Sequence, residues 1–229
     1  MTHASAGIRL QDITDDTVYE VEVRSLVIAG FTGRDVEAVA KHETELRLLG
    51  IPGPDTIPAF YEVPPSLLTA KDEIVVTGDF TSGEVEAVLV IIDDAWLLGI
   101  GSDHTDRALE RAGIQLAKEA CSKVIGFECV RIDRLDDWDG LELRSWVDGE
   151  TDPYQEGTMA EILQLPVIMD RAAQARGELQ NGDVMFLGTL PVIGAKLRAS
   201  KSFTGELRIP TLGHTLKVSY GVRIAADGG

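Results

Sequence analysis

Segments with the pattern of β-strands fill much of this chain, and they do not alternate regularly with helices. Residues 17–23 are the clearest case, because apolar and polar side chains follow one another with a period of two. Further strands are predicted over residues 74–77, 85–92, 124–132, 141–147, 184–187, 196–203, 206–209 and 216–224. Because regular strand–helix–strand units are missing, this order predicts an α+β fold on a twisted, mostly antiparallel β-sheet or β-roll.

Three segments carry helical signals, which predicts a few peripheral helices around the sheet. The first follows Asp35, has apolar side chains at helical spacing and closes at Gly50. The second is predicted over residues 107–119. The third is predicted over residues 159–176, with Pro166 as an interruption.

A proline-rich segment separates the first predicted helix from the rest of the chain. Residues 51–65 contain five prolines, which forbid a helix there. No flexible linker is visible elsewhere. Residues 1–229 are therefore predicted to form one domain.

The charge balance excludes several classes of partner. The chain has 38 acidic against 21 basic residues and a net charge of −17. Such a surface repels both the phosphates of nucleic acids and anionic membranes, so neither is expected as a partner. A small anionic substrate would need local positive charge, which a bound divalent cation would supply.

The chain also lacks signals for export or membrane insertion. Its start has no basic segment followed by an apolar run, and its longest apolar stretch, residues 87–92, is too short to span a bilayer. The two cysteines, Cys121 and Cys129, do not match the spacing of a zinc site. These features predict a cytoplasmic protein with two reduced, structural cysteines.

Two carboxylates stand side by side in the strand predicted around residue 85. Side chains at positions i and i+2 of a strand point to the same face, so Glu84 and Glu86 share a face. Like charges this close repel each other, and a divalent cation would turn that repulsion into binding. The alternative is a solvated outer face of an edge strand.

A second polar cluster follows an apolar strand that ends in Gly99 and Gly101. The two glycines allow the backbone to approach a ligand closely. Asp103 and His104 lie at the predicted junction between strand and helix, and Arg107 opens the helix against its dipole. Oxygen-rich ligands favour Mg²⁺, Mn²⁺ or Ca²⁺ over zinc. Simple helix capping is the alternative interpretation of the acidic residues here.

His42 and Glu45 form a third cluster, within the first predicted helix. They lie three positions apart, which is close enough for a hydrogen bond. A glutamate that orients a histidine makes it a general base able to activate water. The alternative is an ordinary surface pair.

The fourth cluster closes the strand predicted over residues 184–187. Gly188 and Thr189 follow it and offer backbone N–H groups and a hydroxyl. Such donors at a strand end suit a substrate carboxylate. A hairpin turn with a structural threonine is the alternative.

In their order along the chain, the four clusters resemble the catalytic domain of the fumarylacetoacetate hydrolase superfamily, most closely a bacterial branch of it. That family has a His-x-x-Glu helix, a proline-rich run, a Glu-x-Glu strand, an Asn-Asp-x-Ser-x-Arg-like segment and a closing Gly-Thr-Pro motif. The similar segments here are residues 42–45, 51–65, 84–86, 102–107 and 182–191. A lysine follows the aspartate in that family, and Lys118 fits it.

The resemblance implies a divalent-metal-dependent enzyme that is a homodimer and acts on a small 2-oxo acid. It implies Mg²⁺ or Mn²⁺ acting as a Lewis acid on an enolate, with hydrolysis of a C–C bond in an acylpyruvate-like substrate. The implied metal ligands are Glu84, Glu86 and Asp103; the implied substrate contacts are Arg107, Gly188 and Thr189; the implied catalytic residues are His42, Glu45 and Lys118.

Three departures from the family pattern keep the reaction open. An Asn-Tyr pair of the family is replaced by residues 31–33, the stretch between Glu86 and Asp103 is shorter, and Glu110 stands where a glutamine is common. Decarboxylation, isomerisation or hydration could use the same enolate. A non-catalytic metal- or ligand-binding module, or a scaffold whose carboxylates only cap and solvate, are further alternatives.

Overall fold

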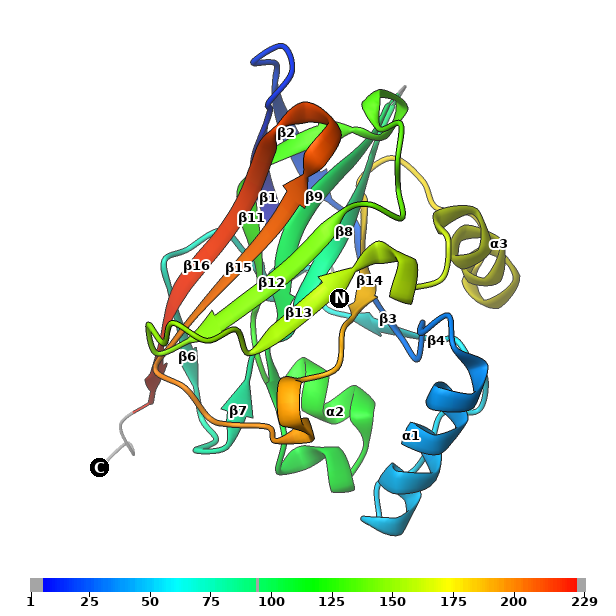
Figure 1. Cartoon of the computed structure of the whole chain (residues 1–229), viewed down its shortest axis with the longest axis vertical. Coiled ribbons are helices and arrows are strands. Elements are labelled where there is room, and N and C mark those ends of the chain that lie inside the picture. Colours follow the sequence, from blue (N-terminus) through cyan, green and yellow to red (C-terminus); the bar gives the residue numbers. More distant parts are fainter. Residues whose placement is uncertain (1–5, 94, 226–229) are drawn as a thin grey trace.

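The computed structural model of the chain describes residues 6–93 and 95–225, and strands dominate it (Figure 1). The largest sheet has nine strands. They are β2 (Val18–Val23), β1 (Ala6–Asp12), β11 (Lys123–Arg131), β9 (Ala95–Asp103), β8 (Val85–Ile92), β14 (Asp183–Thr189), β3 (Ser25–Gly30) and β4 (Ala59–Val63) in spatial order, with β5 (Leu68–Thr69) paired to β11. Most neighbours are antiparallel, whereas β1–β11, β5–β11 and β3–β14 are parallel.

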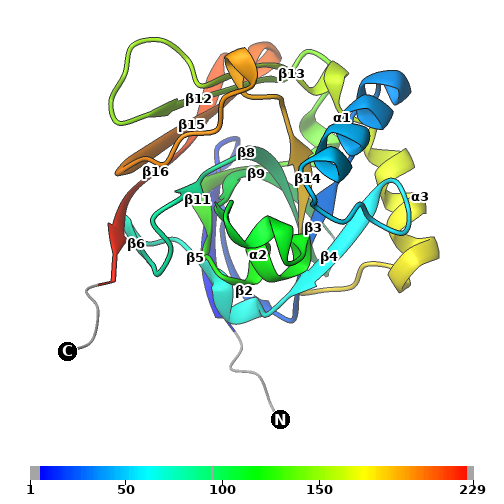
Figure 2. The same ribbon diagram turned by 90° about the horizontal axis from the view of Figure 1, so that it is seen from below.

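A second sheet packs against the outside of the first. Its five strands, in order, are β13 (Gln155–Thr158), β12 (Glu142–Val147), β15 (Ser202–Ile209), β16 (His214–Ile224) and β6 (Glu73–Val76). Figure 2 shows the large sheet curled into a half-barrel, with the second sheet laid along one side. The predicted α+β class and mostly antiparallel β-roll are confirmed.

Strand β8 lies between β9 and β14 in the middle of the large sheet, and both of its faces are buried because a hydrophobic core covers each of them. Val85 and Leu89 belong to the core between the two sheets, whereas Val88 and Val90 belong to the core inside the curl. Glu86 shares the side of Val88, so its carboxylate faces the inside of the curl. A solvated edge strand is therefore excluded for this segment.

Three α-helices lie within the described residues: α1 (Val36–Leu48), α2 (Ile114–Glu119) and α3 (Leu165–Arg176). In Figure 2, α2 lies across the end of the curled sheet, and α1 and α3 lie outside it. Helix α1 follows Asp35 as predicted, and the Asp35 side chain caps it. No residue of α1 is fully buried, and its apolar side chains Val39 and Leu46 are only half-buried. None of these helices is long and apolar enough to cross a membrane.

The helix predicted over residues 107–119 does not form as one element. Residues 105–106 form β10, which pairs with β7 (Thr81–Ser82), and a single 3₁₀ turn spans Leu109–Arg111. Only α2 is α-helical. The cause is Gly113, whose φ of 151° breaks the helix between the turn and α2.

The helix predicted over residues 159–176 is also divided. A 3₁₀ turn, Met159–Glu161, is capped by Thr158 and ends before α3 begins. Pro166 lies in the first turn of α3, where the missing N–H group costs no hydrogen bond. The proline therefore opens this helix instead of interrupting it.

The predicted strand bounds are wrong by the most residues at β15 (Ser202–Ile209). The strands predicted over residues 196–203 and 206–209 are a single strand, β15, and residues 196–200 lie outside any strand. The Asp148 side chain accepts hydrogen bonds from the backbone N–H groups of Lys201 and Ser202, at 2.6 and 3.1 Å. These contacts fix the point at which β15 begins.

Candidate metal centre

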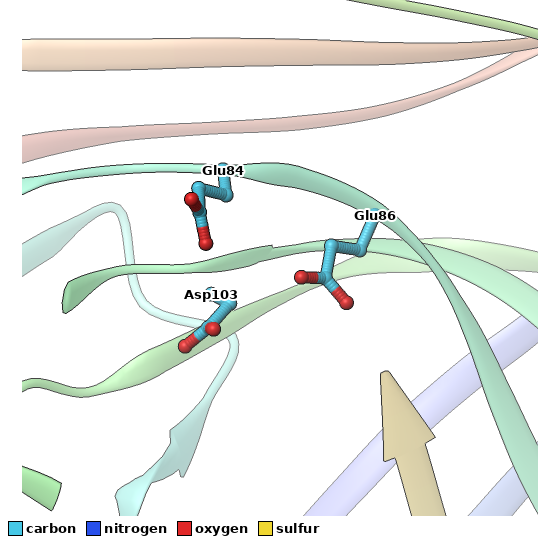
Figure 3. Close-up of side chains that lie close together, drawn as sticks. All are labelled: Glu84, Glu86 and Asp103. Carbon is cyan, nitrogen blue, oxygen red and sulfur yellow. The ribbon is translucent and has the colours of Figure 1, made fainter. Parts of the chain in front are cut away.

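Three carboxylates meet at the end of the β8–β9 pair, as Figure 3 shows. Glu84 precedes β8, Glu86 is the second residue of β8, and Asp103 is the last residue of β9. The Asp103 N–H donates to the Glu84 carbonyl at 3.0 Å, which locks the two chain segments together. One ligand oxygen from each of the three side chains lies within 4.8 Å of the others. The structure thus brings together the three implied metal ligands.

Among the three carboxylates, Glu86 has no direct ion pair, whereas Glu84 and Asp103 each contact a cationic side chain. The Glu86 side chain is buried, and its Oε2 accepts a hydrogen bond from the Gly188 N–H at 2.8 Å. Gly188 has a φ of 99°, and a Cβ there would meet Thr32 Oγ1 at 1.8 Å, so only glycine fits. Burial, followed by the nearby charge of Asp103, raises the pKa of Glu86 well above its usual range.

Asp103 is held by two ammonium groups. Lys118 of α2 contacts its Oδ2, and Lys123 of β11 lies 2.8 Å from its Oδ1. Burial alone would raise the pKa of Asp103, but the charges of Lys118 and Lys123 outweigh it and hold the pKa below its usual range. The surroundings therefore favour the ionised form of Asp103, whereas burial disfavours the ionised form of Glu86.

Arg107 completes the charge balance around Glu84. Its Nη2 lies 2.9 Å from Glu84 Oε1, its Nη1 lies 2.7 Å from Glu110 Oε1, and its Nε donates to Ser82 Oγ at 2.7 Å. Burial alone would lower the pKa of Arg107, but Glu84 and Glu110 raise it instead. Arg107 lies beside the carboxylates as predicted, yet its donors face protein acceptors.

The donor set fits a hard divalent cation. Carboxylate oxygens are the ligands that Mg²⁺ and Mn²⁺ prefer, and the cluster offers no sulfur or imidazole ligand in the group that converges. Glu84 is only half-buried, so the cluster keeps one side toward solvent. Glu84, Glu86 and Asp103 could therefore hold the ion, with open positions left for a second ligand.

Thr189 lies at the end of β14, next to the cluster, but its hydroxyl already has protein partners. It donates to the Val85 carbonyl at 2.8 Å and accepts a hydrogen bond from Gln155 Nε2 at 2.8 Å. Gln155 Oε1 in turn accepts from the Val85 N–H at 3.0 Å. The Gly188 N–H likewise serves Glu86. Both residues therefore shape the site, and their predicted contacts with substrate stay predictions.

His42 and Glu45 lie apart from the cluster, on the exposed helix α1. The His42 ring stacks near Phe31, with 6.0 Å between ring centroids, and Glu45 lies 3.9 Å from Lys41 Nζ. No hydrogen bond joins His42 to Glu45, both of which the structure describes. Both side chains lie on the surface and do not contact each other through a hydrogen bond, and their predicted role in water activation stays a prediction.

The sequence patterns named His104 without showing its contacts, and they missed Lys123. His104 is buried, with its Nδ1 2.9 Å from the Tyr220 hydroxyl and its Nε2 2.9 Å from Thr81 Oγ1. Burial, with Lys123 adding to it, lowers the pKa of His104 to about 3, so the imidazole is neutral. Lys123 itself opens an apolar strand. A lysine at the start of an apolar strand was the available signal, but only sheet register shows what it contacts.

Solved structures share this architecture over nearly the whole chain. A putative fumarylpyruvate hydrolase from Burkholderia cenocepacia has a TM-score of 0.67 at 17% identity, covering 99% of this chain and 95% of that chain. A putative fumarylacetoacetate isomerase/hydrolase from Oleispira antarctica has a TM-score of 0.63 at 22% identity, covering 93% and 98%. Fumarylpyruvate hydrolase from Pseudomonas aeruginosa, in complex with Mn²⁺ and pyruvate, has a TM-score of 0.63 at 17% identity, covering 98% and 99%.

These likenesses define the class: the chain has the fumarylacetoacetate hydrolase fold, as the sequence motifs indicated. A family model described as "Protein of unknown function (DUF2848)" matches residues 29–220. The chain therefore belongs to this family. No curated protein matches it.

Proposed function

We propose that this protein is a divalent-metal-dependent enzyme that hydrolyses a C–C bond in a small, acylpyruvate-like 2-oxo acid. The observation that carries the proposal is the convergence of Glu84, Glu86 and Asp103 beside the ammonium group of Lys118. The Pseudomonas aeruginosa fumarylpyruvate hydrolase, which has the same fold, was solved with Mn²⁺ and pyruvate, and this supports the choice of ligands. When bound, Mg²⁺ or Mn²⁺ would supply Lewis-acid chemistry toward a 2-oxo carboxylate.

The chain's own residues supply the remaining chemistry. Lys118 is almost fully buried, and Asp103 outweighs the effect of burial and raises its pKa, so it remains a cation. Its ammonium group would stabilise the negative charge that develops on the substrate oxygen as the enolate forms. Tyr61, whose ring centroid lies 5.7 Å from Lys118 Nζ, shields that group from solvent. The resemblance also assigns substrate contacts to Arg107, Gly188 and Thr189. To make them, each would have to exchange a present protein acceptor for the substrate: Glu84 for Arg107, Glu86 for Gly188 and the Val85 carbonyl for Thr189.

Hydrolysis further requires that His42, oriented by Glu45, reach the substrate. Because no residue of α1 is fully buried and only Val39, Glu43 and Leu46 are half-buried, the helix has few contacts to lose if it closes over the cluster. In the closed arrangement His42 would take a proton from water. The need for this movement makes water activation the most demanding part of the proposal.

The test combines binding and turnover. Calorimetry should detect Mn²⁺ binding to the wild-type protein, and a panel of acylpyruvates and oxaloacetate should reveal turnover that EDTA removes. No Mn²⁺ binding would refute the metal site. Mn²⁺ binding without turnover of any substrate would instead support the second candidate class, a non-catalytic metal- or ligand-binding module.

Decarboxylation, isomerisation or hydration is the alternative reaction on the same cluster. The exposure of His42 and Glu45 favours it, because an enolate can form and be protonated without a water-activating pair. Activity on oxaloacetate that survives His42→Ala would select this alternative over hydrolysis.

The assembly and the compartment complete the proposal. A homodimer in the cytoplasm is proposed, in line with the sequence resemblance and with two cysteines that are buried and free. Light scattering that returns the 24.8 kDa mass of one chain would refute the dimer.

A further inference from the structure

A second lysine, absent from the sequence motifs, holds Asp103 on the side opposite Lys118. Lys123 is the first residue of β11 and stands directly across from Asp103 in the antiparallel β9–β11 pair. Its Nζ lies 2.8 Å from Asp103 Oδ1 and donates to the His104 carbonyl at 2.6 Å. Its side chain is 0% exposed. The register of the sheet therefore fixes this cation, and solvent cannot replace it.

The two lysines differ in their freedom to move. Lys118 comes from the last turn of the short helix α2, which lies at the end of the curled sheet. Its side chain is 9% exposed to solvent. Lys123 comes from a strand in the middle of the large sheet, and both of its named acceptors belong to the adjacent strand end. Lys118 therefore has solvent on one side of its contact with Asp103 Oδ2, whereas Lys123 is fully enclosed beside Oδ1.

We propose that Lys123 is a positioning residue: a permanent internal counter-cation that holds Asp103 in the absence of a divalent ion, presents one oxygen of Asp103 to the site and sets the cation affinity. This inference rests on the proposed function, because it requires the carboxylate cluster to bind a divalent cation. One carboxylate oxygen, Oδ1, is occupied permanently, so Asp103 acts through Oδ2 alone.

The charges around the cluster decide the sign of the effect. Glu84, Glu86, Asp103 and Glu110 face Arg107, Lys118 and Lys123. A fixed ammonium group beside a ligand carboxylate repels an incoming dication, and little water is present to screen the repulsion. We infer that this repulsion outweighs the loss of the one hydrogen bond that orients Asp103, because Lys123 and Asp103 are both fully buried. Removal of the charge on Lys123 is therefore expected to tighten cation binding while it destabilises the cation-free protein.

Mn²⁺ titration and thermal melting of the full chain test this. Lys123→Met should bind Mn²⁺ at least about tenfold more tightly than wild type and melt at a lower temperature in EDTA. Added Mn²⁺ should raise its melting temperature by more than it raises that of wild type. Lys123→Gln keeps a donor for Asp103 without the charge, and it should show the same pattern. It replaces the methionine variant if that one does not fold.

Tyr220→Phe is the matched control, because it removes a buried hydroxyl that contacts His104 and Ser102 without altering any charge. It should lower the melting temperature equally in EDTA and in Mn²⁺ and leave Mn²⁺ affinity unchanged. If folded Lys123 variants behave like this control, or bind Mn²⁺ more weakly than wild type, the inference is wrong. If wild type itself binds no Mn²⁺, it is the proposed function that fails, a result that the wild-type titration alone identifies.

Discussion

The carboxylate cluster and helix α1 carry the two halves of the proposed chemistry, and the fold treats them in opposite ways. Glu86 and Asp103 are buried, and each has at least one hydrogen-bond partner in another strand or helix. His42 and Glu45 lie on an exposed helix, and the nearest charged partner of Glu45 is Lys41 of the same helix, at 3.9 Å. The carboxylates are part of the sheet, whereas His42 and Glu45 lie on the surface of the molecule.

This difference shows where a short motif predicts geometry and where it does not. The spacing in Glu84-Val85-Glu86 places two carboxylates on one face in any strand, and strand pairing then adds Asp103. The spacing of His42 and Glu45 only allows a contact, because exposed long side chains gain little from meeting. A working site would need tertiary closure to supply what the helix lacks.

The largest expected effect is loss of metal binding on removal of a buried acceptor. Glu86→Gln keeps the size of the side chain and the hydrogen bond from Gly188, but it removes the charge that would attract the ion. Calorimetry should detect no Mn²⁺ binding, while the variant stays at least as stable as wild type, because repulsion from Asp103 is relieved. Unchanged affinity would show that the cluster is not the metal site.

Asp103→Ala should be the most damaging substitution for the fold itself. It leaves Lys118 and Lys123 buried without their shared carboxylate, and breaking a buried ion pair in this way costs about 3–5 kcal/mol. Urea denaturation of the cation-free protein measures the loss, with Glu86→Gln as the control of similar burial. Equal stability of the two variants would contradict the contrast between these carboxylates.

His42→Ala tests the surface half of the site. If the protein is a hydrolase, kcat should fall by ~10²–10⁴, the usual contribution of a general base, with Mn²⁺ affinity unchanged. The free energy of unfolding should change by less than ~0.5 kcal/mol, because His42 is exposed. Glu45→Gln should reduce kcat less, because the imidazole remains. Full hydrolytic activity in His42→Ala would mean that the pair is an ordinary surface pair.

The smallest predicted effect is a pH dependence of cation binding. The pKa of Glu86 is raised, so below that raised pKa the cation-free site binds a proton that must leave when Mn²⁺ binds. Affinity should therefore rise with pH above the ordinary glutamate value of 4.5, by up to about tenfold per pH unit, and level off above the raised pKa. Calorimetry in two buffers of different ionisation enthalpy counts the released proton. Proton release that is absent throughout this range would contradict the assignment.

The sequence predicted the strand-rich class because period-two patterns are local, as over residues 17–23, which became β2. The prediction was wrong where a single residue determined whether a helix began or ended. Gly113 divided the helix predicted over residues 107–119, and Pro166 began a helix that it was expected to interrupt. In both cases the effect depends on the position of the residue relative to a helix end.

For the site, the sequence by itself determined the identity and spacing of the carboxylates, because a strand imposes its own side-chain alternation. Only the tertiary structure decided their environment. The β9–β11 register set Lys123 across from Asp103, and the β14–β8 pair set the Gly188 N–H on Glu86. Register depends on contacts between residues far apart in the chain, and no local pattern encodes which buried cation will face which carboxylate.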